Sequence, residues 1–127
     1  MEKYALNLNP QKSAKALGSG LKISAKNATV VCKAINGMPL QKGKKYLQDV
    51  LAEAKTINKR YYTKTTASVL ELLNSAEKNS EFKGLDTERL FIHAAAQKGF
   101  RFYRPRRMKM RGQLRKVANV QIVLEQR

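Results

Sequence analysis

The sequence predicts an α+β fold in which three helices pack on a small, three-stranded, mostly antiparallel sheet, with a long basic β-hairpin projecting from it. Apolar residues recur at helical spacing over the first two-thirds of the chain and alternate with period two over the last third. The alternation occurs in two segments, and between them lies a run of basic residues that carries too much charge to be buried in a core. With 127 residues and 43% hydrophobic content, we expect a single domain over residues 1–127, with residues 98–116 as an extended hairpin.

The first elements follow a polar N-terminal arm that we expect to end near Gly20. The alternation from Leu21 to Ser24 predicts a short strand. The Ser24 hydroxyl is suited to capping a helix that runs to about Asn36, and Gly37 ends that helix. The inward positions of this helix are Ala28, Val31, Cys32 and Ile35.

Two more helices follow. Pro39 suits the first turn of a helix that we expect to end near Ile57. A third helix is predicted to begin at a Thr65 or Thr66 cap and to close at Gly84. The predicted inward residues are Leu40, Leu47, Val50, Leu51 and Ala54 in the second helix, and Val69, Leu72, Leu73 and Ala76 in the third.

Two strands are predicted in the last third of the chain, and we expect them to pair. In the first of these, Leu90, Ile92, Ala94 and Ala96 share one side, opposite Phe91, His93 and Ala95. In the second, Ala118, Val120, Ile122 and Leu124 point inward, and Asn119, Gln121 and Glu125 point outward.

The segment between these strands, residues 98–116, contains nine basic residues and no acidic one. It leaves and re-enters the sheet as the continuation of two paired strands, so it must project outward, by about 30 Å if each arm has about nine residues. A solvated, disordered loop is the alternative for such a charge run. The flanking strands favour a structured finger that becomes ordered in an anionic groove.

The charge of the chain points to nucleic acid as its partner. The formal net charge is +17, and a compact chain this basic repels itself unless an anion compensates. The finger is rich in arginine, which forms planar, bidentate contacts with phosphate and stacks on bases, so RNA is favoured. Phe100, Phe102 and Tyr103 either stack on bases or pack across the hairpin.

We therefore predict a spread of RNA-binding cations, on the finger and on the body. The predicted RNA-binding residues are Lys12, Lys15, Lys22, Lys26, Lys42, Lys44, Lys45, Lys59, Arg60, Lys98, Arg101, Arg104, Arg106, Arg107, Lys109, Arg111, Arg115 and Lys116.

Enzymatic chemistry is not expected, because no constellation of catalytic or metal-ligating residues is visible. His93 is interpreted as packed or bonded to RNA, and Cys32 as a small core residue. For the same reason we expect no cofactor, no metal and no small-molecule substrate. We also expect no membrane association, since no uncharged run approaches the length of a membrane span. The N-terminal residues lack a secretory signal, and the chain is expected to be cytoplasmic.

Several segments resemble the large-subunit ribosomal protein family called L twenty-two in bacteria and L seventeen in eukaryotes. They are the run from Asn9 to Ala16, then Leu21, Ile23, Ser24 and Lys26, then Ala34, Ile35, Asn36, Gly37 and Met38, and the group Lys45, Tyr46, Leu47 and Val50. The stretch from Leu72 to Asp86 is similar to the archaeal and eukaryotic branch. Eukaryotic relatives carry a longer basic insertion after the second helix, so this chain resembles a shortened form.

The resemblance implies a structural constituent of the large ribosomal subunit that binds and stabilises its rRNA near the peptide exit tunnel. It implies neighbouring large-subunit proteins as partners, and a hairpin tip that lines the tunnel and meets the nascent polypeptide. By position, this tip is Arg104, Pro105, Arg106, Arg107, Met108, Lys109, Met110, Arg111 and Gly112. The alternative, which composition leaves open, is a free RNA- or DNA-binding protein of the chaperone or nucleoid type that uses the same hairpin.

Overall fold

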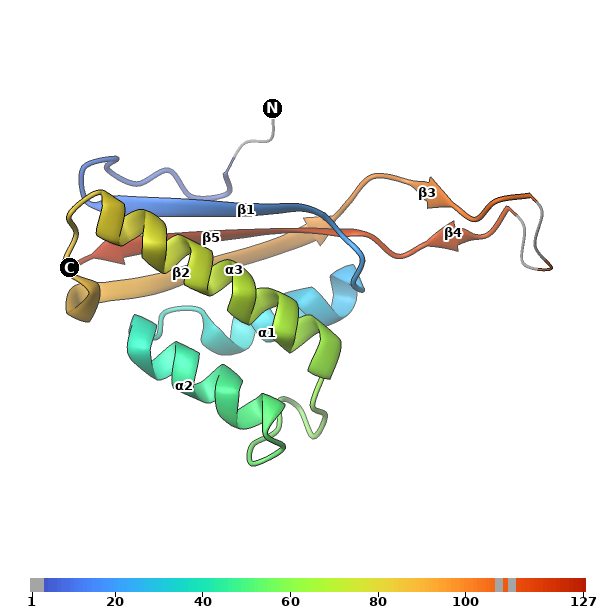
Figure 1. Cartoon of the computed structure of the whole chain (residues 1–127), viewed down its shortest axis with the longest axis horizontal. Coiled ribbons are helices and arrows are strands. Elements are labelled where there is room, and N and C mark those ends of the chain that lie inside the picture. Colours follow the sequence, from blue (N-terminus) through green and yellow to red (C-terminus); the bar gives the residue numbers. More distant parts are fainter. Residues whose placement is uncertain (1–3, 107–108, 110–111) are drawn as a thin grey trace.

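The computed structural model describes residues 4–106, 109 and 112–127, and it has the predicted α+β architecture (Figure 1). The helices are α1 (Ala25–Ile35), α2 (Leu40–Leu51) and α3 (Thr63–Phe82), followed by the short 3-10 helix η1 (Thr87–Arg89). The strands are β1 (Ser13–Leu21), β2 (Leu90–Lys98), β3 (Phe102–Tyr103), β4 (Leu114–Arg115) and β5 (Ala118–Gln126).

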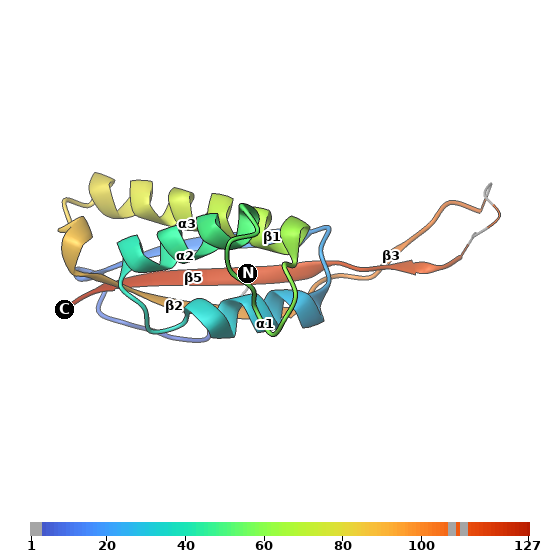
Figure 2. The same cartoon turned by 90° about the horizontal axis from the view of Figure 1, so that it is seen from below.

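The main sheet is antiparallel, with the strand order β1-β5-β2. The helices lie together on one face, where α3 packs against β1, α1 against β2, and α2 against α3 (Figures 1 and 2). The N-terminal segment runs along the opposite face (Figure 1). The central strand of the sheet is therefore β5, the last strand along the chain.

The core lies between the sheet and the helices. Val120, Ile122 and Leu124 of β5 are fully buried, as predicted, and so are Leu90 and Ile92 of the neighbouring β2. Each such aliphatic side chain stabilises the fold by about 1.5 to 3 kcal/mol relative to an exposed position. The helices contribute most of the predicted inward residues to the same cluster: Ala28, Val31, Cys32 and Ile35, then Leu40, Leu47 and Val50, then Val69, Leu73 and Ala76. Leu51 and Leu72, also predicted to face inward, are only half-buried.

The first strand is the clearest correction. We predicted a polar arm to Gly20 and a strand from Leu21 to Ser24, but β1 covers Ser13–Leu21. Its inward residues, Ala14 and Ala16, are small, because α3 packs directly over β1. Alanine, glycine and serine carry little strand propensity, so the alternation of this strand was not recognisable from hydropathy.

Both predicted serine and threonine caps are wrong. Ser24 is the N-cap residue of α1, but its side chain makes no capping hydrogen bond. Helix α3 begins earlier than expected, after Tyr62, which has a left-handed backbone with φ of 44°. Thr65 and Thr66 are buried inside the helix, and the Thr66 hydroxyl donates to the Tyr61 carbonyl instead.

The second helix ends at Leu51, six residues before the predicted end at Ile57. Glu53 has a left-handed backbone with φ of 61°, and the Asp49 carbonyl accepts hydrogen bonds from the amides of Ala54 and Lys55. This pattern closes a helix and turns the chain away from its axis. Ala54, predicted to face inward, is consequently exposed.

Asn119 and Gln121 of β5 lie on the outer face of the sheet, as predicted, but this face is covered as well. These side chains are 5% and 6% exposed. The Gln121 side-chain oxygen accepts a hydrogen bond from the Ala5 amide at 2.9 Å, and the Asn119 oxygen accepts one from the Gly20 amide at 2.9 Å. The N-terminal segment thus contacts the central strand at Gln121, and the end of β1 contacts it at Asn119.

Candidate nucleic-acid interface

A two-stranded hairpin extends from the end of the sheet where β2 finishes and β5 begins (Figure 1). At its base the Gly99 amide donates to the Val117 carbonyl at 2.9 Å. Further out, Phe102 pairs with Arg115 and Tyr103 with Leu114 in the β3–β4 ladder. Val117 is 6% exposed, so the base is anchored in the body.

The predicted hairpin cations are directed to solvent wherever the structure describes them. Lys98, Arg101, Arg106, Lys109, Arg115 and Lys116 are exposed, and Arg104 is half-buried. The amide of Arg104 donates to the Gln113 carbonyl at 2.9 Å, so the arms remain paired up to this level. Of the predicted tip, Arg107, Met108, Met110 and Arg111 lie outside the described residues.

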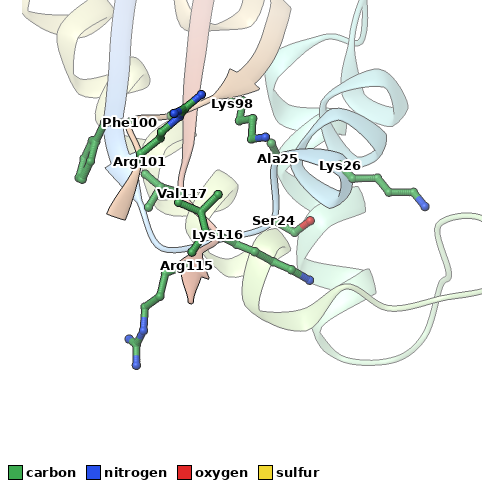
Figure 3. A pocket seen from close by; sticks show the side chains of 11 residues that line it. Ser24, Ala25, Lys26, Lys98, Phe100, Arg101, Arg115, Lys116 and Val117 are labelled. Carbon is green, nitrogen blue, oxygen red and sulfur yellow. The ribbon is translucent and has the colours of Figure 1, made fainter. Parts of the chain in front are cut away.

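Two grooves lie along the stem of this hairpin, and they share Ser24, Phe100 and residues 114–117 as lining residues. The smaller, of about 370 Å³, separates the stem from the first turn of α1. Figure 3 shows its five cations. Lys26 comes from α1 and Lys98 from the end of β2, whereas Arg101, Arg115 and Lys116 come from the two hairpin arms, with Arg115 directed away from the body.

The second groove, of about 600 Å³, adjoins the first along the same stem; we call it the wide groove. It lies between the hairpin and the starts of α1 and α3, and none of its lining residues is acidic. Its five cations are Lys22, Lys64, Arg104, Arg115 and Lys116. Four of these were predicted, and Lys64 was not included, because only the fold brings the start of α3 beside the hairpin.

The remaining predicted cations are spread over the body. Lys12, Lys22, Lys26, Lys42, Lys45, Lys59 and Arg60 are exposed. Two others already have internal partners: Lys15 lies 4.9 Å from the centre of the Tyr4 ring, and Lys44 forms an ion pair with Glu77 that joins α2 to α3. Lys44 is therefore the predicted RNA-binding residue that the structure favours least.

His93 and Cys32 both have partners within the folded chain: His93 contacts Glu125, and Cys32 is packed in the core. The His93 ring nitrogen Nε2 lies 2.9 Å from Glu125 Oε2, and this bond lowers the pKa of Glu125 below its usual value. Burial raises the pKa of the Cys32 thiol to about 12, as expected of a core residue.

Among the described residues, no three ligand-type side chains cluster to hold a metal ion. None of the described helices is long and apolar enough to cross a membrane.

Comparison with known proteins identifies the family. The model of ribosomal protein L22p/L17e matches residues 16–125. The chain is 33% identical to the large ribosomal subunit protein uL22 of Methanocaldococcus jannaschii, with 98% of this chain and 94% of that protein aligned. It is 34% identical to the uL22 of Methanococcus vannielii over 97% and 95%, and 40% identical to that of Maconellicoccus hirsutus over 72% and 62%.

The alignment with the Methanocaldococcus jannaschii protein spans 147 positions, more than the 127 residues of this chain, which agrees with a shortened form. The recognition made from sequence motifs is confirmed by these matches over nearly the whole chain. The chain belongs to the ribosomal protein L22p/L17e family, and it is accordingly a structural protein of the cytoplasmic ribosome rather than an enzyme.

Proposed function

We propose that this chain is a structural constituent of the large ribosomal subunit that binds and stabilises large-subunit rRNA near the peptide exit tunnel. The observation that carries the proposal is the paired, basic hairpin that extends from the end of the sheet in a chain of this ribosomal family. Its exposed cations can neutralise phosphates on several sides at once, as folded RNA requires.

The single-domain organisation is part of this proposal. The described body, residues 4–97 and 117–127, contains the packed core and anchors the extended hairpin of residues 98–116. A backbone hydrogen bond between Gly99 and Val117 pairs the two arms of the hairpin where they leave the body. The rRNA-binding residues are the cations predicted from the sequence, with Lys64 added.

We further propose that the hairpin tip, Arg104 to Gly112, lines the exit tunnel and meets the nascent polypeptide. The β3–β4 ladder, which precedes and follows this tip in the sequence, already lies well beyond the end of the main sheet in Figure 1. Neighbouring large-subunit proteins are the expected partners of the acidic surface formed by α3 and η1. Its exposed carboxylates are Glu71, Glu81, Asp86 and Glu88. These carboxylates would repel phosphate but suit a basic protein surface.

Sedimentation of a cell lysate through a sucrose gradient tests the assignment to the large subunit. We expect the chain to co-migrate one-to-one with large subunits and to remain bound after a moderate salt wash. A chain that stays at the top of the gradient, or that spreads over all RNA, would instead be a free RNA- or DNA-binding protein of the chaperone or nucleoid type.

Site-directed crosslinking tests the position of the tip. Lys109→Cys introduces an exposed thiol, while the natural Cys32 is buried and unreactive. A photo-crosslinker on this thiol should capture a stalled nascent chain in intact ribosomes. The matched control is Lys78→Cys on the exposed face of α3, which should not capture it. Equal capture from both positions, or none from Lys109→Cys, contradicts tunnel lining.

A further inference from the structure

We propose that the wide groove binds an unpaired segment of RNA, with its phosphates on the groove cations and a base stacked on Phe100 or Phe102. This inference rests on the proposed rRNA binding and makes it more specific, because it distinguishes a single strand from a duplex. The groove, of about 600 Å³, has the size of pockets that hold small organic ligands, and a nucleotide is of that kind.

The charge of the groove favours an anion over any neutral ligand. Lys22 and Lys64 come from the body, and Arg104, Arg115 and Lys116 from the hairpin, so cations face the cavity from both walls. In the part of the chain that the structure describes, none of these five side chains forms an ion pair with an acid. Their charge is therefore available to phosphate groups.

The aromatic rings of the wide groove offer stacking surfaces for unpaired bases, which a duplex does not present. Phe100 and Phe102 both line the wide groove and are 60% and 40% exposed, so neither ring is covered by the opposite arm of the hairpin. Cross-strand packing, the alternative considered from the sequence, thus leaves ring surface free. An exposed ring beside unpaired cations is the combination with which proteins bind single-stranded nucleic acid.

The Phe100 ring lies against Gly20, at the end of β1. A Cβ atom at Gly20 would lie 2.8 Å from Cε1 of Phe100, closer than van der Waals contact allows. The ring edge therefore rests on the bare backbone at the end of β1, and its remaining surface is open. Tyr103 offers a contrast, because it is 54% exposed on the same hairpin but does not line the wide groove.

Fluorescence anisotropy with the full chain tests the proposal. The probes are a single-stranded RNA of about ten nucleotides, a duplex of the same sequence, and a single strand in which the bases are replaced by abasic sites. Phe100→Leu with Phe102→Leu should weaken binding of the single strand roughly tenfold and leave the duplex unchanged, because leucine retains bulk but cannot stack. The wild-type chain should bind the abasic strand as weakly as this double variant binds the normal strand.

Tyr103→Leu is the matched control and should bind all three probes as the wild type does. Unchanged single-strand affinity in the double variant overturns the proposal, and so does an equal loss with Tyr103→Leu. Both results would leave rRNA binding by the chain intact. If the wild-type chain bound none of the probes and did not co-sediment with large subunits, the proposed function itself would be wrong.

Discussion

Nε2 of His93 on β2 lies 2.9 Å from Oε2 of Glu125 on β5, and the two side chains are diagonal neighbours on the outer face of the sheet. Arg127 joins them: its Nε lies 3.5 Å from the same carboxylate oxygen, and its guanidinium stacks 4.7 Å from the Phe91 ring centre. Glu125 thus connects the two strands near the C-terminal end of the sheet.

This contact predicts the acid dependence of stability. The hydrogen bond from His93 lowers the pKa of Glu125 from its usual 4.5, so the contribution of the carboxylate to folding is present above that value and is lost as the pH falls through the lowered pKa. We expect Glu125→Gln to reduce the free energy of unfolding near neutral pH and to make it less dependent on pH in the acid range. Urea unfolding over a pH series measures this.

Glu81→Gln is the control for that experiment, because Glu81 is exposed. Its acid profile should follow that of the wild type. An unchanged acid profile for Glu125→Gln would show that the carboxylate does not stabilise the folded state.

Replacing Arg104, Arg106 and Arg107 with alanine should weaken RNA binding without unfolding the body. Arg106 is exposed, and Arg104 is attached to the paired stem rather than the core. Each lost phosphate contact removes about 0.7 to 0.9 from the slope of log K against log salt concentration, so the slope should fall by about 2. Binding titrations at several salt concentrations give the slope, and the melting temperature should stay unchanged.

A triple alanine variant of Lys33, Lys78 and Arg89 removes the same charge away from the hairpin and should retain a steeper slope. Equal slopes for the two variants would mean that the hairpin has no special role and that net charge alone governs binding.

Gly43→Leu should destabilise the fold although leucine is the better helix former. A Cβ atom at Gly43 would clash with Cδ1 of the fully buried Ile92, so a side chain there must displace this methyl group within the packed core. Overpacking of this kind costs about 1 to 3 kcal/mol. Chemical denaturation measures the loss, and Lys42→Leu, at an exposed position of the same helix, should cost much less.

Cys32 should resist thiol reagents in the folded chain. The thiol is 2% exposed and its pKa is raised to about 12 by burial, so thiolate is scarce at neutral pH. Labelling with a chromogenic disulfide should be at least about a hundredfold slower than in denatured chain, because the core must open first. Comparable rates in the two states would contradict the buried position.

The sequence predicted the elements whose burial leaves a strong hydropathy signal. β2 and β5 were placed correctly because Ile92, Val120, Ile122 and Leu124 alternate with smaller or polar residues. β1 was misplaced because its inward residues, Ala14 and Ala16, are small enough to fit under α3 but carry a weak pattern. The requirement for small residues arises only in the packed structure.

The ends of elements were less predictable than their middles. Nothing in the side chain of Glu53 announces the left-handed backbone that ends α2 there, and Tyr62 behaves similarly before α3. The same holds for the candidate site. The hairpin cations could be found from their density alone, whereas Lys64 joins them only because α3 starts beside the stem.

The position of β5 has a consequence for how the chain acquires its fold. β1 and β2 do not pair with each other; each is hydrogen-bonded only to β5 in the main sheet. Ser13 pairs with Glu125, so this contact joins residues that are separated by almost the full length of the chain. Until residues 118–126 have been synthesised, the main sheet lacks its middle strand, so β1, which packs against α3, and β2, which packs against α1, have no strand that joins them. We therefore expect a slow, late folding step. Because residues 98–116 are synthesised before β5, the basic segment is available to bind RNA before the main sheet has formed.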